Sequence, residues 1–256
     1  MTAYAMCLTK GGTGKSSMAA ELVLALARQG RKVLALDLDQ QGNLTGRLGI
    51  TENTPVDYTA ADVLRGEASL ADAVIPSPRH PNVLVLVGTR ELIAVADYPP
   101  PDLVTSLMFA LRDFGTGSVD DIVTDLQPAA GRMLDVGLAI TDEVIAPVAS
   151  ATEAFDQLKT VEMALASPHM KRLNPNIRLA HIVPTLYDGR RLLDQDIEAT
   201  LRQQYGDRVT KGTVRESVKV KDSYTAGLTL SEYAPTSEVA ADILGVVGEI
   251  LRGTKK

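Results

Sequence analysis

A short glycine-rich stretch near the start of the chain contains two lysines, Lys10 and Lys15. Residues 9 to 17 read TKGGTGKSS. In a phosphate-binding loop, backbone N–H groups at a helix N-terminus surround phosphate oxygens, a lysine reaches the outer phosphates, and a hydroxyl ligates Mg²⁺. These requirements are met by Gly11, Gly12, Gly14, Lys15 and Ser16. Thr9 stands where the common pattern has its first glycine. The loop alone leaves Lys10 without a role.

A dinucleotide-binding loop is the main alternative for the same stretch. Gly12-Thr13-Gly14, with Asp37 about twenty residues further on, resembles part of that fingerprint. The alternative fails at Ser17, where a third small glycine should let helix and strand pack closely, and it leaves Lys15 unexplained. A glycine-rich turn with a chance lysine explains still less. We therefore expect a nucleoside triphosphate site.

Two carboxylates, Asp37 and Asp39, follow the apolar segment KVLALDLD. Both fall where a strand is expected to end, at the carboxyl edge of the sheet, which is the ligand side of open α/β folds. Carboxylates there suit Mg²⁺ or a polarised water. Helix capping or a turn remains an alternative role for each of them.

Short apolar segments alternate with amphipathic ones along the rest of the chain. Strands are predicted at residues 3–9, 32–39, 82–88, 120–125, 142–148 and 177–185, with a weaker one at 207–214; helices are predicted at 15–29, 151–166, 192–205 and 237–251. Such alternation is typical of a mostly parallel, twisted sheet with helices on both faces. We expect one α/β domain over residues 1–256.

Composition excludes several classes of protein. Of the 256 residues, 45% are hydrophobic, yet no apolar run is long enough to cross a bilayer and the first residues lack the features of a signal peptide. The one cysteine, Cys7, lies in an apolar segment and is expected in the core. It allows no internal disulfide and no cysteine-only metal cluster. We expect a cytoplasmic protein.

Charge is distributed unevenly. The net charge is −6, but residues 171–221 contain eleven basic and six acidic side chains. This segment is the place to look for a polyanion site. A solvated face with ordinary ion pairs is the alternative, since no aromatic side chains accompany the cations to stack on bases.

Three ordered motifs together resemble the ParA/MinD family of P-loop ATPases. KGGTGKSS resembles its deviant Walker A motif, ALDLDQQGNLT its second signature, and DDIVTDLQPAAGRM followed by ITDEVIAPV its third. PTLYDGRRLLDQDI and TVRESVKVKDSY are similar to the carboxyl-terminal part of ParA partition proteins. One departure is Gln127, which stands where the family usually has the first of two prolines.

The resemblance implies a P-loop NTPase fold and a role for the additional lysine. In this family two ATP-bound monomers pack face to face, and Lys10 would reach the phosphates of the partner's nucleotide. Asp39 would orient the attacking water, Asp37 would support the strand end, and Asp125 would hold Mg²⁺. The residues expected to bind ATP are Lys10, Gly11, Gly12, Thr13, Gly14, Lys15, Ser16, Ser17 and Asn43, with Ser16, Asp39 and Asp125 at the metal. No strong general base is evident, so slow ATP hydrolysis is expected until a partner stimulates it.

The same resemblance implies a DNA-partitioning ATPase that forms a homodimer with ATP, binds double-stranded DNA non-specifically, responds to a ParB-like partner and associates with the nucleoid. The expected DNA-binding residues are Arg190, Arg191, Arg215, Lys219 and Lys221. Two alternatives remain: a positioning ATPase that moves a protein assembly over the nucleoid, and a small-molecule ATP-dependent ligase on the same fold. A membrane-bound relative of the MinD type should end in an amphipathic helix, and the ending GEILRGTKK does not favour one.

Overall fold

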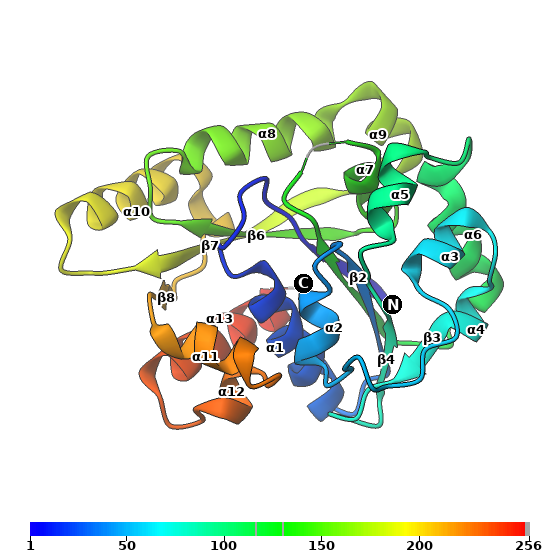
Figure 1. Ribbon diagram of the computed structural model, residues 1–256. Helices are drawn as coiled ribbons and strands as arrows, with labels where there is room; N and C mark the ends of the chain where they lie inside the picture. Colours follow the sequence, from blue (N-terminus) through cyan, green and yellow to red (C-terminus); the bar gives the residue numbers. More distant parts are fainter. Residues whose placement is uncertain (116, 130, 254–256) are drawn as a thin grey trace.

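One sheet organises the protein, and all adjacent strand pairs except one run parallel (Figure 1). The computed structural model describes residues 1–115, 117–129 and 131–253. The strand order is β3-β4-β2-β5-β1-β6-β7-β8, with β3 antiparallel to β4. The strands are β1 (Thr2–Met6), β2 (Val33–Leu38), β3 (Val74–Pro76), β4 (Val83–Leu86), β5 (Asp121–Leu126), β6 (Glu143–Ala149), β7 (Arg178–Tyr187) and β8 (Val214–Arg215).

Helices cover both faces of this sheet, as Figure 1 shows. The helices are α1 (Lys15–Arg28), α2 (Asn43–Arg47), α3 (Ala60–Arg65), α4 (Leu70–Ala73), α5 (Leu92–Asp97), α6 (Leu103–Phe114), α7 (Arg132–Ala139), α8 (Ala154–Ala166), α9 (Pro168–Leu173), α10 (Leu192–Tyr205), the 3₁₀ turn Gly206–Arg208, α11 (Val218–Thr225), α12 (Leu230–Tyr233) and α13 (Glu238–Gly253). Within the described ranges, no helix combines the length and the apolar character that a membrane crossing requires.

Two hydrophobic cores lie on opposite faces of the sheet because successive strand side chains point to opposite sides. In β1, Ala3 and Ala5 belong to the core under α3, α6, α7 and α8, whereas Tyr4 and Met6 belong to the core under α1, α12 and α13. Cys7 continues the first set and is buried, as predicted. Both faces of the strands are apolar because both are covered, which confirms the predicted fold class.

The predicted strands and helices differ from the observed ones in several places, and several helices, α6 and α7 among them, were not predicted. The weak strand predicted at 207–214 is wrong over most of its length, because residues 206–208 form the 3₁₀ turn and only Val214 and Arg215 form β8. Val209 makes one isolated bridge to Ile182. The antiparallel β3 is a three-residue edge strand, too short to show a pattern in the sequence.

Strand order explains how distant motifs meet. β5 lies between β1 and β2, with Asp125 in register with Met6 on one side and with Asp37 on the other. The glycine-rich loop leaves β1 directly after this level, and Asp39 follows β2. The carboxyl ends of three strands therefore place the loop and the carboxylates at one edge of the sheet.

Candidate nucleotide site

The loop before α1 has the backbone that anion binding requires. Gly14, the residue before α1, has φ 94, and Gly12 has φ 76, conformations that glycine adopts without the steric cost of a side chain. α1 has no side-chain cap at its N-terminus and no acidic residue in its first turn. Its first N–H groups and its dipole therefore favour a phosphate there.

Lys15 is held inside this loop. Its Nζ donates to the carbonyl oxygen of Lys10 at 2.9 Å, and the residue is 6% exposed. Burial lowers the pKa of Lys15, while the charges of Asp125 and Asp39 act to raise it. The hydrogen bond to Lys10 therefore keeps the ammonium inside the loop, and Asp125 and Asp39 lie near it at the same edge of the sheet.

Lys10 has a different environment. Its side chain is 44% exposed, and its Nζ lies 3.9 Å from Oε2 of Glu153, just before α8. It is not among the residues that line the cavity next to the loop. The backbone of Lys10 thus supports Lys15, while its own ammonium lies near Glu153.

Asp37 acts as a structural support. Its Oδ2 accepts hydrogen bonds from the backbone N–H of Thr45 at 2.8 Å and from the Thr45 hydroxyl at 2.7 Å. Its Oδ1 accepts from the N–H of Asp39 at 3.2 Å. Burial raises the pKa of Asp37 to about 6, and the hydrogen bonds from Thr45 act to lower it. Asp37 therefore attaches the start of α2 to the end of β2.

Asp125 and Asp39 provide carboxylates for a cation. Asp125 is fully buried, and neither of its carboxylate oxygens has a hydrogen-bond partner in the part of the chain that the structure describes. Burial and the charge of Asp37 raise the pKa of Asp125; Ser16 lowers it, although its approach falls short of hydrogen-bond geometry. Asp39 lines the cavity, and its Oδ1 accepts from the N–H of Gln41 at 2.9 Å in a tight turn.

These carboxylates fit Mg²⁺. Buried carboxylate oxygens without partners are costly unless a cation or a donor satisfies them, and Mg²⁺ prefers oxygen ligands. Ser16, Asp39 and Asp125 would hold the ion through their oxygens or its water shell. When bound, Mg²⁺ would supply positive charge next to the phosphates.

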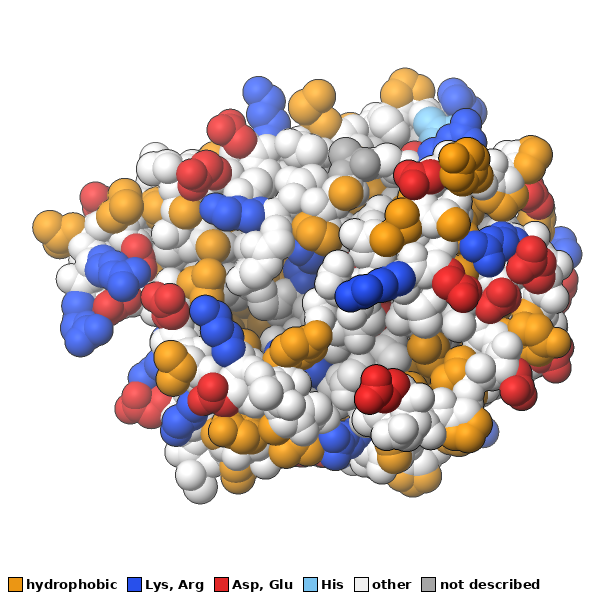
Figure 2. Space-filling view, viewed as in Figure 1, with side chains coloured by type: hydrophobic (Ala, Val, Ile, Leu, Met, Phe, Trp, Pro, Cys, Tyr) orange, Lys and Arg blue, Asp and Glu red, His pale blue; other side chains and the backbone are white. Residues whose placement is uncertain are grey.

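A cavity of about 1290 Å³ opens beside the loop, and Figure 2 shows the hollow on this face. The lining includes Gly11, Gly12, Gly14, Lys15, Ser16, Ser17, Asp39 and Asn43, all of them residues assigned to a nucleotide site from the sequence. Thr13 lies outside this lining: it is buried, and its carbonyl oxygen accepts from the Thr185 hydroxyl of β7 at 2.9 Å.

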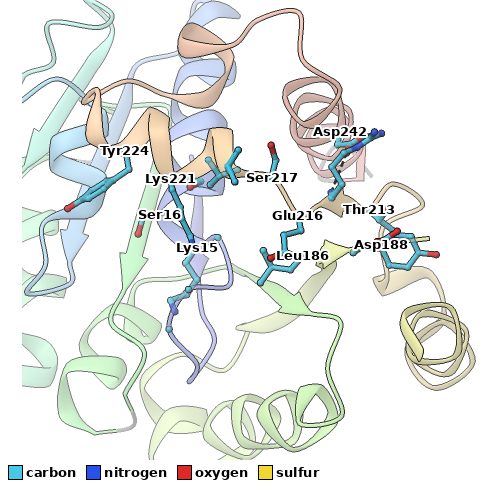
Figure 3. A pocket seen from close by; sticks show the side chains of 18 of the residues that line it. Lys15, Ser16, Leu186, Asp188, Thr213, Glu216, Ser217, Lys221, Tyr224 and Asp242 are labelled. Carbon is cyan, nitrogen blue, oxygen red and sulfur yellow. Dashed lines mark hydrogen bonds and ion pairs between the residues drawn. The ribbon is translucent and has the colours of Figure 1, made fainter. Parts of the chain in front are cut away.

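Other residues of the lining were not among the predicted site residues, although most of them lie in the two carboxyl-terminal motifs that resemble ParA proteins. At one end, Figure 3 shows Leu186, Asp188, Thr213 and Glu216 around the ends of β7 and β8. At the other end, Arg47 of α2 and Tyr224 of α11 line the same cavity. Arg47 lies outside the quoted motifs, and no feature of the sequence singled it out.

Four of the five predicted DNA-binding residues, all except Lys219, line this cavity, and all three arginines are paired. Arg215 makes ion pairs with Asp242, at 2.6 Å, and with Glu238. Arg190 pairs with Asp188 at 2.9 Å, and Arg191 lies 3.6 Å from Asp188 and 3.7 Å from Glu216. Side chains of both signs are accordingly interspersed over this end of the molecule in Figure 2. Lys219 and Lys221 have no ion pair among the described residues.

The fold and this site define a nucleotide-binding domain. Residues 4–230 match the CobQ/CobB/MinD/ParA nucleotide binding domain, and the chain belongs to that family. Among curated relatives, the chromosome-partitioning ATPase Soj of Thermus thermophilus is 34% identical over 238 residues, covering 91% of this chain and 88% of the relative. The chromosome partitioning protein ParA of Caulobacter vibrioides is 29% identical over 231 residues, covering 85% and 82%. The predicted family is confirmed.

Solved structures share the fold. The cobyrinic acid a,c-diamide synthase of Mycobacterium smegmatis, with bound ADP and magnesium, has a TM-score of 0.82 at 24% identity, covering 100% of this chain and 96% of that one. A single-residue variant of Cyanothece McdA, in complex with ATP, has a TM-score of 0.82 at 22% identity, covering 98% and 96%. At this identity the likeness concerns the fold alone, and both neighbours contain the kind of ligand predicted for the site.

Proposed function

We propose that this chain is a ParA-like ATPase that dimerises around ATP, binds DNA non-specifically and partitions plasmid or chromosomal DNA. A ParB-like partner would stimulate its hydrolysis of ATP to ADP and phosphate. The similarity to Soj and ParA over most of the chain supports this proposal. The family and the lining of the cavity support ATP and Mg²⁺ as the ligands.

The main structural observation behind the proposed dimer is the contrast between the environments of Lys10 and Lys15. Lys15 is buried beside the cavity, whereas Lys10 is half exposed and directed toward Glu153. An exposed ammonium next to a phosphate site is available to a second protomer. At a dry interface a charge of this kind interacts with phosphate more strongly than it does in water.

The site's own residues account for slow hydrolysis. Lys15 and the N–H groups at the start of α1 would bind and orient the phosphates, and Asp39, in its turn at the cavity wall, would position a water. Phosphoryl transfer depends on such positioning and on charge stabilisation. The N–H of Gln41 holds one oxygen of the Asp39 carboxylate in place, which supports a positioning role.

DNA retardation with ATP, with ADP and without nucleotide tests the proposal. We expect binding with ATP and much weaker binding in the other two conditions. Equal binding in all three, or none with ATP, would contradict the DNA-partitioning function. Absence of DNA binding with intact ATP binding would instead favour the small-molecule ligase. A protein-assembly cargo would be recognised by capture of that assembly with ATP-dependent DNA binding retained.

Lys10→Ala and Lys15→Ala form a matched pair for the trans role of Lys10. We expect Lys15→Ala to lose ATP binding in calorimetry, because its ammonium is held inside the loop that is expected to bind the phosphates. Lys10→Ala should keep ATP binding within about threefold, since its charge is exposed and screened, and lose dimerisation and hydrolysis. If both variants lose ATP binding equally, Lys10 acts within its own site.

A further inference from the structure

Arg47, the last residue of α2, connects α2 to α11 across the edge of the nucleotide cavity. It is 5% exposed. Its Nη1 donates to the Ser223 hydroxyl at 3.2 Å and to the carbonyl oxygen of Leu228 at 3.3 Å, and its Nη2 donates to the carbonyl oxygen of Val220 at 3.3 Å. The Tyr224 ring centroid lies 5.5 Å from its Cζ. One guanidinium therefore holds both α11 and the loop that follows it.

The charge of Arg47 is buried without a close carboxylate. Burial lowers the pKa of Arg47, and the charges of Glu21 and Asp125 act to raise it. Neither forms an ion pair with it within the described residues, so neutral oxygens and a ring face hold the guanidinium. The planar guanidinium, with its several N–H donors, can bond to such a set of acceptors, and a lysine ammonium cannot replace this geometry.

The other end of α2 is continuous with the switch segment, which we define as residues 39–43 at the cavity wall, because Asn43 is the first residue of α2. Thr45 is bound to Asp37 by two hydrogen bonds, and its hydroxyl also accepts from the N–H of Gly88 at 3.1 Å. The N–H of Gly42 donates to the carbonyl oxygen of Asp39 at 3.0 Å. The five-residue α2 thus begins in the switch segment, is held to the end of β2 at Thr45 and ends at Arg47.

α11 forms a wall of the cavity and carries two lysines without ion pairs among the described residues. Val220, Lys221 and Tyr224 line the cavity together with Asp39 and Arg47. Figure 3 shows Lys221 and Tyr224 on this helix, above Lys15 and Ser16. A ligand that contacts the switch segment thus lies next to α2, and α2 reaches α11 through Arg47.

We propose that Arg47 is a positioning residue that transmits nucleotide binding from the switch segment to α11. The part of this inference that concerns DNA rests on the proposed function, since Lys219 and Lys221 are its predicted DNA contacts. The nucleotide sets the position of the switch segment, α2 follows it, and the Arg47 fork fixes α11 and the direction of its lysines. Coupling of this kind is a difference in free energy between two sites, so it appears as a change in one site when the other is filled.

Arg79 offers a matched control. It is also a mostly buried arginine, with 24% of its side chain exposed, and it donates from Nη2 to the carbonyl oxygen of Gly227, in the loop after α11. It lies 3.9 Å from Glu232. Unlike Arg47, it comes from the segment between β3 and β4 and is not part of the cavity lining. Its removal should loosen the same loop without breaking the link to the switch segment.

Amide hydrogen exchange with and without Mg²⁺ and a non-hydrolysable ATP analogue tests the proposal in the absence of DNA. In the wild-type protein we expect the analogue to slow exchange in residues 218–225 by about tenfold or more. Arg47→Met and Arg47→Lys should lose most of this effect while amides at the start of α1 still respond. Arg79→Met should retain it.

Three results would overturn the proposal: no response of α11 in the wild-type protein, a wild-type response in Arg47→Met, or an equal loss in Arg79→Met. If Arg47→Met does not fold, Ser223→Ala, which removes one acceptor of the fork, replaces it and should weaken the response. A failure of the proposed function can be distinguished from these results, because the wild-type protein would then not bind DNA. The exchange measurement, which uses no DNA, would still test the role of Arg47.

Discussion

The two charged regions of this protein are organised in opposite ways. At the phosphate end, which we define as Lys15, Asp37, Asp39 and Asp125, the charges are buried and Asp125 has no hydrogen-bond partner among the described residues. At the cationic rim, defined as Arg190, Arg191, Arg215, Lys219 and Lys221, the side chains are exposed, and the arginines already pair with carboxylates.

At the phosphate end, buried charges lack partners that a ligand could supply. At the cationic rim, most cations already have carboxylate partners from the same chain. Buried carboxylates cost stability until a cation is bound. Exposed ion pairs contribute about 0 to 1 kcal/mol and are screened by salt. Ligand removal should therefore matter most at the phosphate end, and at the cationic rim the two lysines should matter more than Arg215.

The largest expected effect is at Asp125. Asp125→Asn should reduce ATP hydrolysis by about 100-fold or more, because the carboxylate that would hold Mg²⁺ is lost. The nucleotide-free protein should become more stable by roughly 1 kcal/mol, because an unpartnered buried carboxylate is removed. Phosphate release and thermal unfolding measure the two changes.

Asp135→Asn is the control for that prediction. The pKa of Asp135 is also raised by burial, but the residue lies in α7 with His169 nearby and outside the cavity lining. Hydrolysis should be unchanged in this variant. A wild-type rate in Asp125→Asn would remove Asp125 from the metal site.

A smaller effect is expected at Thr45. Thr45→Val removes one donor to the buried Asp37 and should lower the free energy of unfolding by about 1 to 3 kcal/mol. Because the folded pKa of Asp37, about 6, lies above the ordinary 3.8, its ionisation costs stability as pH rises between these values. The Thr45 hydroxyl stabilises the ionised form, so the loss should be greater at pH 7 than at pH 4 in chemical denaturation.

Thr200→Val provides the comparison for Thr45. The Thr200 hydroxyl is on α10, where it donates to the carbonyl oxygen of Asp196 at an exposed site. Its replacement should change stability by less than about 0.5 kcal/mol at either pH. A Thr45→Val effect of the same small size would show that Asp37 does not depend on this hydroxyl.

At the cationic rim, the double variant Lys219→Gln with Lys221→Gln should weaken DNA binding more than Arg215→Gln does. Each lost phosphate contact lowers the salt dependence of binding by about 0.9 in the slope of log K against log salt. We expect a decrease of about 2 per protomer for the lysine pair and less than about 0.5 for Arg215→Gln, measured by fluorescence anisotropy. Equal decreases would mean that DNA displaces Asp242 and Glu238 from Arg215.

The smallest effect concerns Cys7, next to the phosphate end. Burial raises the pKa of the Cys7 thiol to about 12, and the Lys15 charge lowers it only in part. At pH 8 the thiol is protonated and therefore a poor nucleophile. Native protein should resist alkylation and react only when unfolded, as mass spectrometry would show. Rapid labelling of folded protein would indicate that β1 opens locally.

Much of the fold could be predicted because its signals are local. Apolar strands covered on both faces and amphipathic helices are visible in windows of a few residues, and the central strands and α10 lie where the pattern placed them. The strand predicted at residues 207–214 is wrong for a related reason. A 3₁₀ turn and a two-residue strand are too short to show a periodic pattern of apolar residues. β3 was missed for the same reason.

The candidate site divides along similar lines. Gly14, Lys15 and Ser16 are consecutive residues, so their spacing alone predicted a phosphate loop. Arg47 and Tyr224 line the same cavity but are far apart in the chain. The residues next to them in the sequence do not predict that they are in contact. The pairing of Arg215 with Asp242 was equally invisible, because it depends on how α13 packs against β8.

The sequence by itself therefore determined the class of fold, the phosphate loop and the family, since each is written in consecutive or periodic residues. Tertiary structure decided which charges are buried and which are paired. Because β5 lies between β1 and β2, Asp125 is buried beside the loop, whereas Lys10 stays exposed. The arginines of the rim form ion pairs with carboxylates. The physical reason is that a charge's effect depends on its burial and its neighbours, and both are set by packing between distant segments.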